Sequence, residues 1–150
     1  MHTNEEAFHE LSFYTLSHPT AGHPTGGKGT FIHQHVVDAQ AAQMATEKTK
    51  PIQLVFALVG LYLFLEKGKT GIEVQNFHLR MSQKKQEWPL IELPGRRGEV
   101  TAVHVLAAPA GDQRDDKIKT WCQSVWEAYQ PSRDIIVKLV ESYIKPYEPF

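Results

Sequence analysis

Apolar residues recur every three or four positions along most of the chain, the spacing that places them on one face of an α-helix. Six stretches show this spacing and carry helix start or stop signals at their ends. They cover residues 4–18, 30–45, 51–67, 71–88, 118–130 and 133–145. The pattern predicts an all-α protein, a single-domain helical bundle of about six helices that spans residues 1–150.

Capping residues mark the ends of these stretches. Thr70 and Glu73 have the spacing of a capping box, in which each side chain satisfies a backbone amide at the start of a helix. Gly68 suits the end of the stretch before it, because glycine readily adopts the left-handed conformation of a C-terminal cap. The other expected start signals are Asn4, Thr30, Pro51 and Ser132.

The most apolar stretch, residues 54–65, contains no charged residue but spans only 12 residues. A membrane-spanning helix needs about 20 consecutive apolar residues. We therefore expect a buried central helix and no membrane partner.

Residues 89–109 form an irregular segment with two interpretations. Residues 90–93 and 100–105 could pair as a β-hairpin, or Thr101 could cap a short helix over residues 102–107. The short helix is favoured. Residues 19–29, which are rich in glycine and proline, are predicted to be a loop.

The charge balance argues against a polyanion as partner. Sixteen Lys and Arg residues face 17 Asp and Glu residues, for a formal net charge of -1, so no nucleic-acid binding is expected. Cys122 is the only cysteine, which excludes an internal disulfide and a cysteine-rich zinc site. Residues 1–10 are acidic and polar where an export signal needs a basic start and an apolar run. We expect a cytoplasmic protein.

A group of polar residues offers a candidate site. His35 and Asp38 lie one helical turn apart, so they share a face of the second predicted helix. A buried histidine bonded to the aspartate is the expected state, since buried polar groups usually satisfy each other. Gln43 on the same helix and His78 on the inner side of residues 71–88 complete the set. This polar pocket is predicted to serve a structural role or to bind a small ligand.

The alternative is a metal-dependent enzyme of the helical-bundle type, similar in outline to the DinB-like proteins. Its divalent metal ion would be held by His35, Asp38, His78 and His18, because histidines and carboxylates from separate helices are common ligands of such ions. No stringent metal-binding spacing occurs in the chain, so this hypothesis rests on residue types alone.

Two further hypotheses concern the surface. Lys28, Arg96 and Arg97 are candidate anion ligands: Lys28 follows a glycine-rich run that lacks the Ser or Thr of a phosphate-binding loop, and the two arginines lie between glycines. The apolar and aromatic faces of residues 118–130 and 133–145 are a candidate homodimer contact, since two-fold dimers are frequent among globular proteins.

The chain also resembles a bacterial family of unknown function, DUF5946. The residues that carry the likeness in the second and third predicted helices are Phe31, Ile32, His35, Val37, Asp38, Ala39, Gln43, Lys50, Pro51, Ile52, Phe56, Ala57, Leu58, Leu61, Tyr62, Leu65, Glu66 and Gly68. Residues 88–93, 100–106 and 121–129 look similar as well.

The resemblance implies a helical intracellular protein and supplies no established activity. It also implies that relatives often carry Tyr and His at the positions of Gln40 and Met44, and that some carry an N-terminal cysteine cluster that this chain lacks. A site that used those residues in relatives is therefore not expected here.

Overall fold

The computed structural model describes residues 3–17 and 32–144, and over these ranges it contains helices and no strand. The elements are α1 (Asn4–Ser17), α2 (His33–Gln43), α3 (Pro51–Lys67), α4 (Gly71–Ser82), α5 (Ala102–Ala107), α6 (Asp112–Ala128), the 3-10 helix η1 (Gln130–Ser132) and α7 (Arg133–Glu141). The all-α prediction is confirmed.

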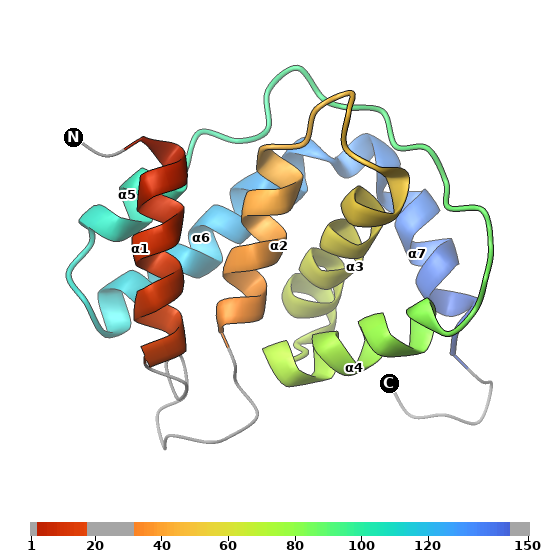
Figure 1. The fold of residues 1–150 in the computed structure, drawn as a ribbon, viewed down its shortest axis with the longest axis horizontal. Coiled ribbons are helices and arrows are strands. Elements are labelled where there is room, and N and C mark those ends of the chain that lie inside the picture. The colour runs from red at the N-terminus through yellow and green to blue at the C-terminus, as the bar shows by residue number, and fades with distance from the viewer. Residues whose placement is uncertain (1–2, 18–31, 145–150) are drawn as a thin grey trace.

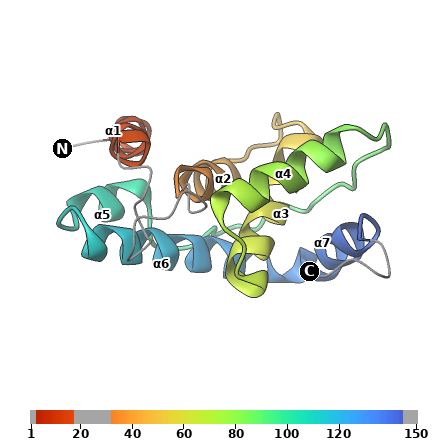
Figure 2. The same ribbon diagram turned by 90° about the horizontal axis from the view of Figure 1, so that it is seen from below.

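The helices pack around a single hydrophobic core. Figure 1 shows α1, α2 and α3 side by side, with α6 passing behind α1 and α2, and Figure 2 shows α6 beneath the same two helices. Helix α4 packs against both α2 and α3, and α7 packs against α3. Residues 83–101, which we call the strap, run from α4 to α5 over one end of the bundle (Figure 1). Helices α2, α3 and α4 therefore meet at one place.

Helix α3 lies at the centre of the bundle, as the uncharged stretch 54–65 predicts. Pro51 occupies its first turn, and Gly68 ends it in the left-handed conformation, with φ 64°. All residues from 57 to 63 are buried. None of the helices in the described part combines the length and the apolar character needed to cross a membrane.

The predicted helix starts are partly confirmed. Thr70 and Glu73 form the expected capping box, with bonds of 3.2 and 3.0 Å to the backbone. Helix α1 begins at Asn4, but the cap predicted there is wrong: the side chain of Thr3, not of Asn4, accepts from the amide of Glu6. Thr30 lies outside the described residues. Ser132 is buried and its hydroxyl makes no cap bond, because the turn of η1 precedes α7.

Two predicted helix ends are also corrected. Helix α2 ends at Gln43 and not at residue 45. Helix α4 ends at Ser82, although its pattern predicted helix as far as Trp88. The chain leaves the helix there and brings the Trp88 ring edge-on to Phe56 of α3, with ring centroids 5.2 Å apart. A tertiary contact thus outweighs the local helical preference.

The short helix α5 confirms the favoured interpretation of the irregular segment, and the hairpin is wrong. The Nδ1 atom of His104 accepts from the Thr101 amide at 3.0 Å, so this histidine helps to cap α5.

The aromatic residues of α6 and of the position that follows it are buried within the chain itself. Trp121 is 0% exposed, Trp126 4% and Tyr129 1%. The predicted dimer contact would therefore have to use other residues. The oligomeric state stays a prediction.

Candidate functional site

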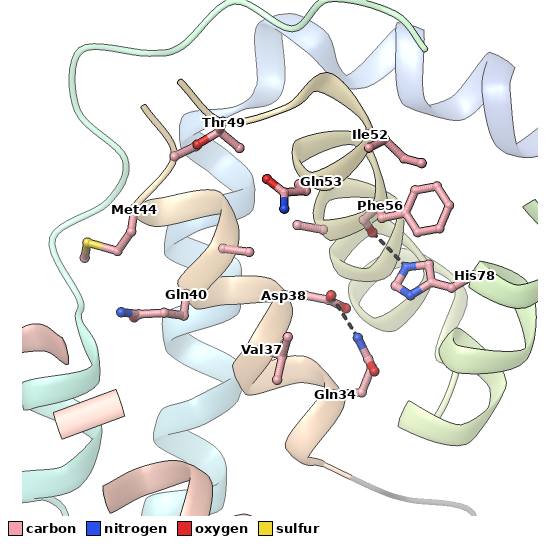
Figure 3. A pocket seen from close by; sticks show the side chains of 13 residues that line it. Gln34, Val37, Asp38, Gln40, Met44, Thr49, Ile52, Gln53, Phe56 and His78 are labelled. Carbon is pink, nitrogen blue, oxygen red and sulfur yellow. Dashed lines mark hydrogen bonds between the residues drawn. The ribbon is translucent and has the colours of Figure 1, made fainter. Parts of the chain in front are cut away.

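A hollow of about 670 Å³ opens between α2, α3 and α4 (Figure 3). Apolar side chains make up most of its wall, and a few polar groups converge on it. Its lining consists of Gln34, Val37, Asp38, Gln40, Ala41, Met44, Ala45, Thr49, Ile52, Gln53, Phe56, Ala57 and His78. We call it the α2–α4 hollow.

Helix α2 presents Gln34 and Asp38 to the hollow, because residues four apart lie on one helix face. The Nε2 atom of Gln34 donates to Oδ1 of Asp38 at 3.0 Å. Asp38 is only 3% exposed, and burial raises the pKa of its carboxyl well above the ordinary value, while the bond from Gln34 acts in the opposite direction. Burial thus favours the protonated, uncharged carboxyl.

The Asp38 carboxyl lies directly against the backbone of α3 at Gly60. A Cβ atom added to Gly60 would sit 1.9 Å from Oδ2 of Asp38 and 2.6 Å from its Cγ. This Oδ2 atom is buried and has no hydrogen-bond partner among the described residues. The glycine in the middle of α3 is what allows the two helices to approach with a carboxyl between them.

The raised pKa of Asp38 has a consequence for stability. The folded protein holds a proton that the unfolded chain releases above the ordinary pKa of aspartate, so stability falls as pH rises from that value towards the raised one. Between pH 5 and the raised pKa of Asp38, wild type should lose about 1 kcal/mol per pH unit relative to Asp38→Asn, whose amide does not titrate. Chemical denaturation of both proteins at several pH values measures this difference. Parallel profiles would show that Asp38 ionises normally in the fold.

His78 of α4 faces the same hollow from the opposite side (Figure 3). Its Nε2 atom lies 2.8 Å from the carbonyl oxygen of Phe56, which can only accept, so Nε2 carries the hydrogen and Nδ1 is left with a lone pair. Burial lowers the pKa of His78, and the bond to Phe56 raises it by less. The ring also stacks on that of Phe56, with centroids 5.1 Å apart. His78 is thus a fixed, uncharged acceptor.

His35 does not pair with Asp38 as expected. Its ring stacks on Phe64 of α3, with centroids 3.6 Å apart and planes at 10°. Its Nδ1 is buried without a partner in the described structure, and burial lowers the pKa of the ring to about 3. The predicted shared face is confirmed, since both residues are buried against α3. The predicted hydrogen bond between them is wrong, because the His35 ring stacks on Phe64 while the Asp38 carboxyl accepts from Gln34.

Gln43 lies away from the hollow and ties three segments together. Its Nε2 donates to the carbonyl oxygens of Arg97 and Val100 at 3.2 and 2.7 Å, and its Oε1 accepts from the Trp121 indole at 2.9 Å. All three contacts are internal to the fold. His35, Asp38 and Gln43 therefore do not share one pocket, contrary to expectation.

Of the candidate anion ligands, Arg97 is placed differently from expectation. The Arg97 guanidinium donates to the carbonyl oxygens of Gln43 and Ala45, so it holds the end of α2. Arg96 is exposed. Lys28 lies outside the described residues.

No group of three or more His, Cys, Asp or Glu side chains that could hold a metal ion occurs in residues 3–17 and 32–144. The stacked ring of His35 and the bonded Nε2 of His78 explain why these residues do not gather around one point. His18 lies outside the described residues, so the full four-residue set stays a prediction. Cys122 is buried, and burial followed by the proximity of Asp38 raises the pKa of its thiol, which disfavours the reactive thiolate.

Sequence reasoning missed Gln34, Gly60 and Phe56. A signal for Gln34 was present in its position four residues before Asp38. Gly60 also carries a sequence signal, because an isolated glycine inside an apolar helix often marks a close approach by another group. Phe56 acts through its backbone oxygen, which no residue type reveals.

Comparison with known proteins gives one match. A family model described as a family of unknown function, DUF5946, matches residues 5–130. Neither the curated proteins nor the solved structures yield a match to the chain.

Proposed function

Since this chain belongs to the DUF5946 family, whose function is unknown, we propose from the geometry alone that the α2–α4 hollow binds a small organic molecule. The observation that carries the proposal is the combination of a mostly apolar hollow of about 670 Å³ with three convergent polar side chains, Gln34, Asp38 and His78. Ligand sites in proteins are typically hollows of about 300–1,000 Å³ with this kind of lining.

The state of Asp38 supports a binding role over a purely structural one. A carboxyl that must be buried in its uncharged form lowers stability at neutral pH, and an apolar residue of similar size would avoid that loss. Packing alone therefore gives no reason for an aspartate at the wall of the hollow. We also place the protein in the cytoplasm as part of this proposal, on the strength of its single, buried thiol at Cys122.

The proposal predicts saturable binding of an uncharged, largely apolar probe. The solvatochromic dye prodan should bind to the purified protein with a blue shift of its emission, because the apolar wall replaces water around it. Ala41→Trp, which places a large ring at the exposed edge of the hollow, should weaken binding about tenfold or more. Fluorescence titration measures both.

Gln123→Trp is the matched control, because Gln123 is exposed on α6 and does not line the hollow. It should bind the dye as wild type does. Equal affinity of wild type and Ala41→Trp would place the dye elsewhere and overturn the proposal, as would the absence of saturable binding.

A further inference from the structure

The polar groups of the α2–α4 hollow restrict which chemical class of ligand it can bind. Among the described residues that line it, only Asp38 and His78 are titratable, and burial favours the uncharged form of each. A charged ligand would lose its hydration on entry and meet no ion of opposite sign there. The lining thus selects against ions of either sign.

Gln34 offers one amide edge to the hollow. One of its two amide hydrogens is donated to Asp38, and no other bond to the side chain is seen among the described residues. If Asp38 accepts the hydrogen trans to Oε1, the remaining N–H donor and the Oε1 acceptor lie side by side on a planar group. A second amide can bind such an edge through two parallel hydrogen bonds, each N–H donating to the other group's oxygen.

His78 adds an acceptor across the hollow from Gln34. Its Nε2–H is used by the Phe56 carbonyl, so Nδ1 is the ring atom available to a ligand. Figure 3 shows Gln34 and His78 reaching towards the same space from α2 and α4, while the Gln40 amide turns away from it. A primary carboxamide has one N–H for the Gln34 oxygen and a second for Nδ1 of His78. Its carbonyl accepts the remaining N–H of Gln34.

The remaining lining residues of the hollow suit a flat apolar group on the ligand. Ile52 and Phe56 come from α3, Met44 from the end of α2, and the Phe56 ring is held by its stacking on His78. An aromatic ring attached to the carboxamide would bury its surface against these side chains.

We propose that the ligand of the α2–α4 hollow is an uncharged primary carboxamide attached to a flat apolar group, recognised by Gln34 and His78. The inference rests on the proposed function, since it assigns a chemical class to the same site.

Three probes of nearly equal shape test the assignment: benzamide, benzoate and benzamidinium, which are neutral, negative and positive. Binding to the full chain at neutral pH is measured by saturation-transfer NMR and by titration of backbone amide shifts. We expect benzamide to bind, and each ion to bind about tenfold more weakly or not at all. Stronger or equal binding of either ion would overturn the carboxamide assignment.

Two matched variants locate the contact. Gln34→Leu keeps the size of the side chain and removes the amide edge, so benzamide binding should weaken about tenfold while prodan binding persists. Gln123→Leu removes an amide from the exposed surface of α6, outside the lining of the hollow, and should leave both affinities unchanged. Unchanged benzamide binding by Gln34→Leu would overturn the assignment, and an unaltered melting temperature for that variant confirms that it folds.

Different results would refute the proposed binding function and the proposed carboxamide class. Prodan binding that responds to Ala41→Trp, together with no binding of benzamide, would refute the carboxamide class and keep the binding function. Absence of both would refute the binding function and the carboxamide class together.

Discussion

Replacing Gln43 with leucine is expected to lower the free energy of unfolding by about 4 kcal/mol. The side chain is 7% exposed and makes three hydrogen bonds, to the carbonyl oxygens of Arg97 and Val100 and from the indole of Trp121. Leucine fills nearly the same volume, so little of the loss comes from a cavity. It leaves the buried indole N–H of Trp121 and the partly buried carbonyls of Arg97 and Val100 without this partner, and a buried polar group left unpaired costs about 1–3 kcal/mol.

Urea denaturation followed by circular dichroism measures the effect. Gln40→Leu is the control on the same helix: Gln40 is half-buried and its Oε1 has no partner in the described structure, so the change should be within about 0.5 kcal/mol. Similar stabilities for the two variants would show that the Gln43 contacts contribute little. A loss seen only in Gln43→Leu would establish the residue as the tie between α2, α6 and the strap.

The parts of the fold that follow from local chemistry could be predicted from sequence. Helix α3 begins at Pro51 and ends at Gly68, and the Thr70 and Glu73 pair opens α4, because these signals act within a few residues. The end of α4 could not be predicted in this way. It is set by the contact of Trp88 with Phe56, which lie 32 positions apart in the chain.

Only the part of the candidate site that depends on helical periodicity could be predicted from the sequence. Periodicity places His35 and Asp38 on one face of α2, and both are buried as expected. It does not say which residues of α3 meet that face, and Phe64 and Gly60 decide what each side chain touches. Gln43 illustrates the same limit, since its partners on the strap and α6 are fixed by tertiary packing.

The close contact between Asp38 and Gly60 makes α3 sensitive to a single methyl group. Gly60→Ala should lower the free energy of unfolding by about 3 kcal/mol, at the upper end of the usual cost of overpacking a core. The new Cβ would lie 1.9 Å from Oδ2 of Asp38, on a helix whose neighbouring residues are all buried. Alanine is otherwise favoured over glycine inside a helix by about 1 kcal/mol, so the steric effect must exceed that gain.

A double-mutant cycle isolates the cause. Asp38→Ala removes the three atoms that lie nearest to the new Cβ, which are the carboxyl carbon and both carboxyl oxygens of Asp38. In that background Gly60→Ala should no longer destabilise the protein and should stabilise it by up to about 1 kcal/mol, which gives a large interaction energy between the two sites. Chemical denaturation of the four proteins completes the cycle. Additive losses would mean that α3 tolerates no side chain at position 60 for reasons unrelated to Asp38, and that the carboxyl does not set the approach of α2 to α3.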